Sequence, residues 1–273
     1  MRTLRYYTKA SEVISLTEML FQLGYDVKIS DSFNLSVDAA VKSFQKEHNL
    51  VVDGIVGPKT WQTLYEECPE IFDQNGKLLS ENDLVEFSNR YGLELAVVKA
   101  VNEVESGGKG FLIDGNPVIL FEGHIFWREL KKRGINPKQY LNDRNEDVLY
   151  EKWTKKYYLG GVREYDRLNK AIAIDNTDAF RQAALSSASW GAFQIMGFHA
   201  DALGYAGIDD FVAKMRQHER EHLFAFGQFL QVNKLIPLLT DKKWAKFAEK
   251  YNGAGYKANQ YDTKLEKAYL KYK

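Results

Sequence analysis

The sequence has little cysteine, no long apolar run and no excess of charge of either sign. Cys68 is the one cysteine among 273 residues, which excludes an internal disulfide and a thiolate-rich zinc site. Lys plus Arg number 37, and so do Asp plus Glu, so no overall field exists to recruit a polyanion. We therefore expect no nucleic-acid partner.

Signals for export and for membrane insertion are also missing. The basic residues among positions 1–10 are not followed by the apolar stretch of roughly 7–15 residues that a secretory signal needs. The longest apolar runs, such as 118–121, are far shorter than the ~18 residues of a membrane span. We expect a soluble chain, made in a reducing cytosol, without stable membrane insertion.

Turn-forming residues divide the chain unequally. Pro69 and the Asn75-Gly76 pair lie between two regions of periodic apolar residues. We predict a small domain at 1–68, a linker at 69–80 and a larger domain at 81–273, since 273 residues suffice for two domains.

The apolar spacing predicts helices nearly everywhere. In the first domain it predicts three, at 11–23, 36–48 and 58–65, the second capped by Ser36 and the third begun by Pro58. In the second domain, Ser80 and Asp83 form an acidic capping box before a helix at 81–91.

A second helix of the larger domain is predicted from Leu93, and it ends at residues 106–108. Segments 111–113 and 118–121 flank an Asp-Gly turn and predict a β-hairpin. The fold class is therefore mainly α, with a small three-helix domain followed by an α domain that carries one small β-hairpin.

Two segments of the first domain form a recognisable pattern. They are Ala-Val-Lys-Ser-Phe-Gln at 40–45 and Asp-Gly-Ile-Val-Gly-Pro-Lys-Thr-Trp at 53–61. Over residues 15–66 this pattern resembles the three-helix peptidoglycan-binding domain of cell-wall hydrolases, although Ser30–Leu35 replaces an Asp-Gly turn common in that family. The resemblance implies a wall-binding module that includes Asp53, Gly54, Gly57 and Trp61. Trp61 and Phe44 could equally be core aromatics.

Two carboxylates, Glu103 and Glu105, end the helix that begins near Leu93. Helical periodicity puts both at the borders of its apolar face, so it does not choose between them. A carboxyl group that is partly buried at a helix C-terminus has a raised pKa, because burial and the negative helix end disfavour its charge. A general acid needs that property at neutral pH.

Four ordered segments of the larger domain resemble the phage-type N-acetylmuramidase domain. They lie at 104–108, 119–124, 189–197 and 251–253, and three of them are also similar to goose-type lysozymes and lytic transglycosylases. The resemblance implies a lysozyme-like domain that cleaves the β-1,4 bond between N-acetylmuramic acid and N-acetylglucosamine. It makes Glu105 the catalytic acid and matches Glu122 to the second acidic position.

The same resemblance implies substrate-binding roles for Ser106, His124, Gln194, Tyr251 and Asn252. Two of these have structural alternatives, since Gln194 could merely satisfy backbone groups and His124 could be a structural hydrogen-bonder. If Glu122 activates water, the enzyme is a hydrolase. If no base operates, the 6-hydroxyl of muramic acid attacks instead, and the enzyme is a lytic transglycosylase.

A competing motif is the His-Glu-x-x-His of residues 218–222, which is a zinc-peptidase signature. His218 and His222 would share one helix face, with Glu249 as a third ligand. The charged flanks favour a solvated helix face, and the muramidase resemblance assigns no metal there, so we expect neither metal nor cofactor. A zinc peptidase, or an inactive wall-binding protein, is the alternative.

The order of binding module and cutting domain resembles modular phage endolysins. This resemblance implies peptidoglycan as the partner, and we expect a monomer. It also implies accumulation in the host bacterial cytoplasm until a holin or similar lesion gives access to the periplasm and cell wall.

Overall fold

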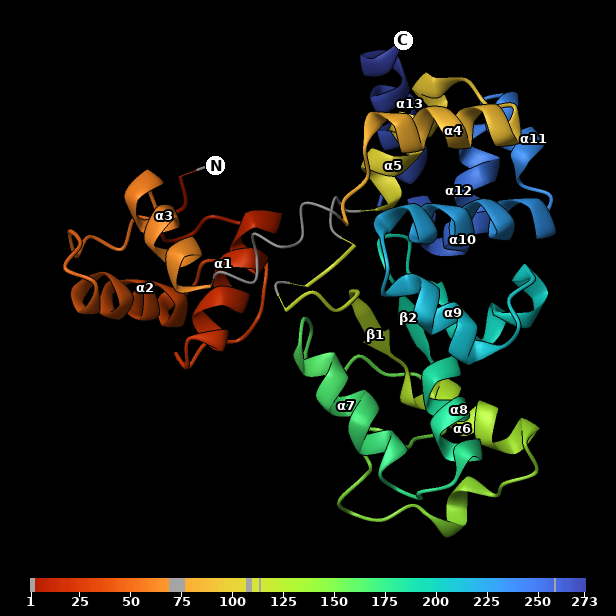
Figure 1. Cartoon of the computed structure of the whole chain (residues 1–273), viewed down its shortest axis with the longest axis horizontal. Helices are drawn as coiled ribbons and strands as arrows, with labels where there is room; N and C mark the ends of the chain where they lie inside the picture. Colours follow the sequence, from red (N-terminus) through yellow and green to blue (C-terminus); the bar gives the residue numbers. More distant parts are fainter. Residues whose placement is uncertain (1–2, 69–76, 107–109, 113, 258) are drawn as a thin grey trace.

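The computed structural model describes residues 3–68, 77–106, 110–112, 114–257 and 259–273. Most of the predicted linker at 69–80 lies outside these ranges. Helices predominate, which confirms the mainly α class. Figure 1 shows the first three helices gathered on one side and the later helices and strands on the other. Two separate clusters of buried apolar residues match this division.

The first domain is built from three helices around an apolar core. They are α1 (Ser11–Gln22), α2 (Leu35–Glu47) and α3 (Pro58–Glu67). The cap of α2 is Asn34, whose Oδ1 accepts the backbone N–H of Ser36 and Val37 at 3.1 Å each. The prediction of Ser36 as the cap was wrong, because the Asn34 side chain, two residues earlier, accepts these N–H groups.

The second domain contains most of the helices. They are α4 (Glu81–Tyr91), α5 (Leu95–Glu105), α6 (Gly123–Lys132), α7 (Arg163–Ile172), α8 (Asp178–Ser186), α9 (Ile208–Met215), α10 (Glu219–Val232), α11 (Ile236–Thr240), α12 (Trp244–Asn252) and α13 (Tyr261–Tyr272). Short 3₁₀ turns are η2 (Pro137–Gln139), η3 (Gly197–His199), η4 (Asp201–Leu203) and η5 (Ala254–Lys257). The predicted capping box before α4 is confirmed: Ser80 Oγ accepts the Asp83 N–H, and Asp83 Oδ2 accepts the Ser80 N–H.

The β-structure is a small antiparallel sheet of β1 (Ile119–Phe121), β2 (Ala188–Trp190) and β3 (Ile195–Met196), in that order. The hairpin predicted over 111–121 was misplaced. Phe111 and Pro117 form only an isolated bridge, while β1 pairs with β2, with Leu120 opposite Ser189. The partner strand lies some seventy residues further along the chain, where local turn signals carry no information about it.

Helix α5 is braced by the last helix. Its buried residues Val97, Val98, Ala100 and Val101 form the predicted apolar face. Helix α13 packs along α5, and Tyr269 Oη donates to Glu94 at 2.9 Å, while Lys271 Nζ and Tyr272 Oη bind Glu103 at 2.7 and 2.5 Å. Both ends of α5 are therefore tied to α13.

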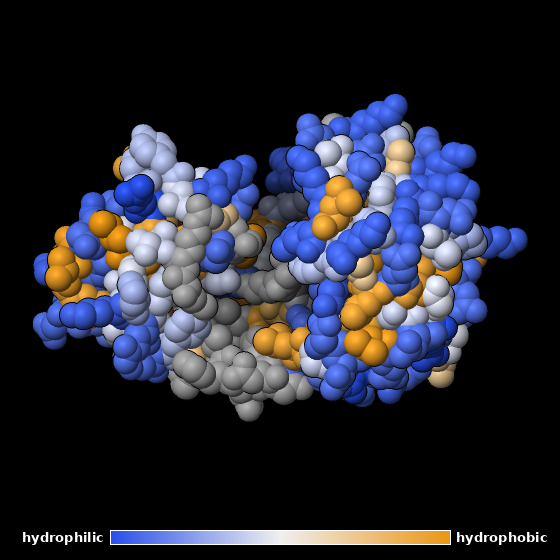
Figure 2. Space-filling view, turned by 90° about the horizontal axis from the view of Figure 1, so that it is seen from above, coloured by the Kyte–Doolittle hydropathy of each residue, from blue (hydrophilic) through white to orange (hydrophobic). Residues whose placement is uncertain are grey.

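The two domains meet at the loop before α7. The guanidinium of Arg163 lies 5.9 Å from the Phe21 ring centre, and a Cβ added to Gly161 would lie 2.8 Å from Ile29 Cδ1. Outside this contact each domain buries its own apolar residues, and the face in Figure 2 is hydrophilic over most of its area, with small apolar patches. Within the described ranges, every helix is too short or too polar to cross a membrane.

Candidate active site

Glu105 is the last residue of α5, and its carboxyl group is half-buried. Burial raises the pKa of this carboxyl to about 7, while the Asn252 amide and the Lys264 charge act in the opposite direction. Burial wins because a carboxylate loses much of its hydration in such a place. At neutral pH the group is therefore poised between acid and base.

A cavity of about 370 Å³ opens beside this carboxyl group. Its walls come from the end of α5, the turn around β3, α10, α12 and the start of α13. The lining residues are Glu105, Phe193, Gln194, Ile195, Met196, His199, Phe229, Tyr251, Asn252 and Tyr261. Four residues predicted from separate sequence segments, namely Glu105, Gln194, Tyr251 and Asn252, are thus brought together.

The end of α12 contacts Glu105 directly. Asn252 Nδ2 donates to Glu105 Oε1 at 3.2 Å, which favours the charged carboxylate. Tyr251 Oη donates to the Phe193 carbonyl at 3.2 Å, and its ring stacks on Phe247 with centroids 5.6 Å apart. Burial raises the pKa of Tyr251, so its phenol stays neutral and acts as a donor.

Gln194 lines the cavity, but its amide is used within the protein. Its backbone adopts φ +49°. Its Oε1 accepts from Ser189 Oγ at 2.7 Å, and its Nε2 donates to the carbonyls of Gly191 and Val118 at 2.8 and 3.3 Å. Both amide protons are therefore engaged, which matches the structural alternative and leaves one acceptor lone pair for a ligand.

Glu103 differs from Glu105 in its surroundings. Lys271 and Tyr272 of α13 hold its carboxylate at the surface and lower its pKa, so it stays charged. Of the two glutamates that periodicity left undecided, Glu105 is the one able to hold a proton near neutral pH.

Three other predicted residues do not line the Glu105 cavity. Glu122 is the residue directly after β1. Its Oε2 accepts from Tyr158 Oη at 2.5 Å and lies 3.3 Å from His124 Nδ1. Burial lowers the pKa of His124, which keeps the ring neutral. Ser106 Oγ donates to the Asn102 carbonyl at 2.5 Å and so serves the end of α5.

Comparison with known proteins identifies the larger domain. The N-acetylmuramidase family model matches residues 94–273. The chain belongs to this family. A peptidoglycan binding domain model matches residues 9–64, so both resemblances inferred from the sequence are confirmed.

Two individual proteins are similar to this muramidase chain. The crystal structure of the Burkholderia AP3 phage endolysin is 42% identical, covers 99% of either chain and superposes with a TM-score of 0.68. The Mycobacterium tuberculosis N-acetylmuramoyl-L-alanine amidase CwlM is 28% identical over 119 residues, which are 42% of this chain. The match spans only 29% of that curated relative.

In this member of the family the His-Glu-x-x-His motif does not have zinc-site geometry. His218 precedes α10 as its cap, with Nδ1 accepting the Arg220 N–H at 2.9 Å. His222 is buried, its Nε2 lies 2.6 Å from the Met215 carbonyl and its Nδ1 accepts the Ala192 N–H at 3.2 Å. Burial lowers the pKa of His222 to about 4. Both nitrogens of this neutral ring are engaged, so no lone pair points to a metal.

The motif instead holds together segments that are distant in the sequence. Glu219 accepts the N–H of Gly110 at 2.8 Å, just after α5, and the N–H of Leu79 at 2.9 Å. The His222 ring supports the turn before Gln194 so closely that a Cβ on Gly191 would lie 2.6 Å from it. No sequence pattern predicts these contacts of Glu219 and His222, because they join distant segments.

The predicted wall-binding residues of the first domain form a braced turn. The buried Gln45 side chain accepts the N–H groups of Asp53 and Gly54 and donates to the Ile55 carbonyl. Gly54 adopts φ +74°, and Gly57 precedes α3. Trp61 is only 3% exposed, so it belongs to the core, as the alternative interpretation held.

Sequence reasoning missed a groove beside this turn. A cavity of about 690 Å³ is lined by Thr3, Ile55 and the residues from Arg5 to Lys9. Tyr7 is 82% exposed there, and its ring centre lies 3.9 Å from that of Tyr6. Exposed aromatic rings are suited to packing on sugar faces.

Proposed function

We propose that this chain is a peptidoglycan hydrolase that cleaves the β-1,4 bond between N-acetylmuramic acid and N-acetylglucosamine. The observation that carries this proposal is the half-buried Glu105 in a cavity, with its pKa near 7 and the Asn252 amide 3.2 Å from its Oε1. Family membership and the endolysin-like structure support the same activity.

Glu105 in its protonated form donates to the glycosidic oxygen as the bond to the muramic acid C1 breaks. The sugar passes through an oxocarbenium-like state, while Asn252 stabilises the carboxylate that Glu105 becomes. That carboxylate then accepts a proton from the water that attacks C1, which restores the acid. We assign Glu122 a supporting role, because Tyr158 and His124 hold it outside the cavity.

The first domain supplies attachment to the wall. Its peptidoglycan-binding family and the exposed Tyr7 beside the Asp53 turn support this role. We further propose that the chain works as a monomer without metal or cofactor. We also propose that it stays in the host cytoplasm until a holin-type lesion admits it to the wall.

Mass spectrometry of fragments released from purified sacculi tests the proposal. Half of each digest is reduced with borohydride. Reducible muramic acid ends are expected. Anhydro-muramic ends would contradict hydrolysis, and cut peptides with intact glycans would contradict the choice of site.

A further inference from the structure

Helix α6 carries basic side chains beside a half-buried aromatic ring, that of Phe198. Arg128 and Lys132 are one turn apart on the same face of α6. The guanidinium of Arg128 lies 4.8 Å from the centre of the Phe198 ring, and Lys132 Nζ lies 5.5 Å from it. The two cations thus converge on one ring, which comes from η3 rather than from their own helix.

This cationic face borders the Glu105 cavity. His199 lines that cavity, and its ring centre is 4.4 Å from that of its neighbour Phe198. The pKa of His199 is lowered by burial and, in addition, by the charges of Arg128 and Lys132. The two basic side chains therefore lie within electrostatic reach of the substrate cavity, on the other side of η3.

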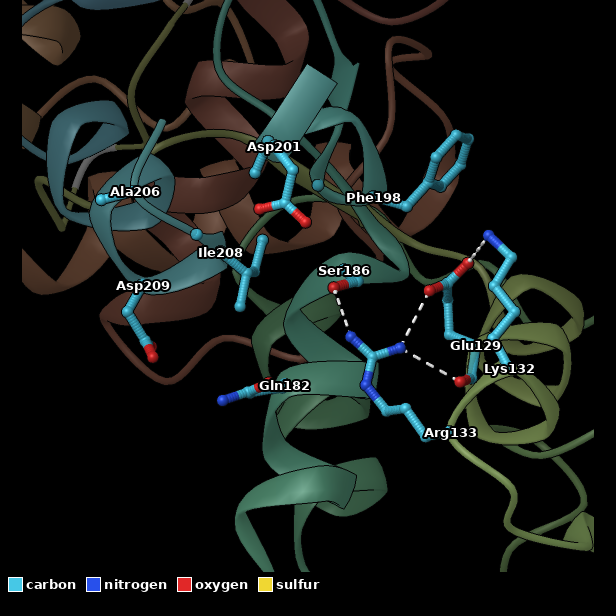
Figure 3. Close-up of a pocket in the computed structure, with 13 residues that line it drawn as sticks. Glu129, Lys132, Arg133, Gln182, Ser186, Phe198, Asp201, Ala206, Ile208 and Asp209 are labelled. Atoms are coloured by element: carbon cyan, nitrogen blue, oxygen red, sulfur yellow. Dashed lines mark hydrogen bonds and ion pairs between the residues drawn. The ribbon is translucent and has the colours of Figure 1, made fainter. Parts of the chain in front are cut away.

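A second cavity, of about 520 Å³, opens on that side, between α6, α8, η3, η4 and α9 (Figure 3). One wall carries Lys132 and Arg133, which bind the buried carboxylate of Glu129 at 2.7 and 2.9 Å. With Arg128, three cations face one carboxylate, so this wall has two positive charges in excess. Asp201 and Asp209 lie on the opposite wall, the latter paired with Arg181.

We propose that this second cavity, together with Arg128, binds the stem peptide of the muramic acid residue at the cleavage site. The inference rests on the proposed function, and it names a part of the substrate that the Glu105 cavity does not contact. The acetylated sugars of the glycan are uncharged, whereas the stem carries several carboxylates. Because the whole chain has no net charge, recognition of these carboxylates needs a local cluster of cations.

The dimensions fit this arrangement. A stem of four residues extends about 13 Å at roughly 3.3 Å per residue. The two cavities lie on adjacent residues of η3, since Phe198 lines the second cavity and His199 lines that of Glu105. A stem attached to the sugar over Glu105 can therefore pass η3 and reach Lys132. Phe198 offers a contact to the methyl groups of the stem's alanines, and Asp201 suits the amine of a diamino acid.

The test compares the full-length protein with the double variant Arg128→Gln/Lys132→Gln and the control Lys131→Gln, an exposed lysine of the same helix. Each acts on intact sacculi and on glycan strands stripped of their stems by an amidase. We expect the double variant to lose about tenfold in kcat/KM on sacculi alone, with the control unchanged on both substrates. Titration with a muramyl-tetrapeptide should show binding by the wild type and weaker binding by the double variant.

Equal losses on stem-carrying and stripped glycan, or no loss on either, would overturn the inference. Amidation of the stem carboxylates should lower the wild-type rate to that of the double variant, and an unchanged rate would contradict the role of charge. A wild type that cuts neither glycan would refute the proposed function instead. The muramyl-tetrapeptide titration would still decide the inference in that case.

Discussion

Asn252 donates a hydrogen bond to Glu105 across 147 residues of sequence, and the distance from its Nδ2 to the carboxyl Oε1 is 3.2 Å. The charge state of Glu105 is therefore set by opposed influences, with burial on one side and this amide and the charge of Lys264 on the other. The predictions that concern catalysis follow from this balance.

Replacing the acid should stop the reaction. We expect Glu105→Gln to lower kcat by about 10²-fold or more, because glutamine donates no proton to the leaving oxygen. Glu103→Gln is the matched control, since Glu103 pairs with α13 at the surface, and it should keep most activity. Release of soluble muropeptides measures both variants, and the reverse ranking would refute the assignment.

The pH dependence should follow the protonation of Glu105. Its folded pKa of about 7 lies above the ordinary 4.5, so activity should fall as the pH rises through about 7. Folding is favoured by the same proton, and this stabilisation is complete below 4.5 and lost as the pH rises through 7. The free energy of unfolding of Glu105→Gln, minus that of the wild type, should thus be larger at about pH 8 than at about pH 4. Denaturant titrations at the two pH values measure this difference, and equal differences would contradict it.

Removing the Asn252 amide should shift the pH at which activity falls on the alkaline side of the pH–rate profile. Asn252→Leu deletes the donor that favours the Glu105 carboxylate, so the pKa of Glu105 should rise further and this fall in activity should move to higher pH. A full pH–rate profile is the measurement. A shift to lower pH, or none, would show that Asn252 does not act on the charge of Glu105.

The histidine motif should matter for stability and not for metal. His222→Ala should destabilise the fold by about 2–4 kcal/mol, because it leaves a cavity against Gly191 and an unsatisfied Ala192 N–H. His218→Ala removes only a helix cap and should lower stability by about 1 kcal/mol. Wild-type activity should survive a strong chelator, and a loss that zinc restores would favour a peptidase.

Deleting residues 1–68 should lower activity on intact sacculi more than on short soluble glycans. The deletion retains Leu79, whose backbone N–H donates to Glu219, so the second domain keeps this hydrogen bond. Tyr7→Ser in the full-length chain is a finer test, and it should weaken cosedimentation with sacculi by several-fold, with the exposed Leu35→Ser as control. Equal effects of the deletion on both substrates would contradict a role of the first domain in wall binding.

Local signals predicted the helices well. Amphipathic spacing and caps located α1 to α5 within a few residues, and Ser80 with Asp83 formed the expected box. These features depend on neighbours within one or two turns, which the sequence displays directly.

The features that the sequence did not predict are determined by contacts between residues far apart in the chain. Glu103 is held outside by Lys271 and Tyr272, and no pattern around position 103 announces them. The partner of β1 and the occupied nitrogens of His222 are likewise set by distant segments. The family resemblance suggested Glu122 for the site, but it does not reveal that this residue lies outside the Glu105 cavity.

The bracing of α5 by α13 has a consequence for the order of synthesis. The groups that fix both ends of α5 are Tyr269, Lys271 and Tyr272, which the ribosome adds more than 160 residues after Glu103. A nascent chain therefore holds its acid-bearing helix without these ties until translation of this region is complete. The acid-bearing helix therefore gains these ties only after all residues that line the Glu105 cavity have been made.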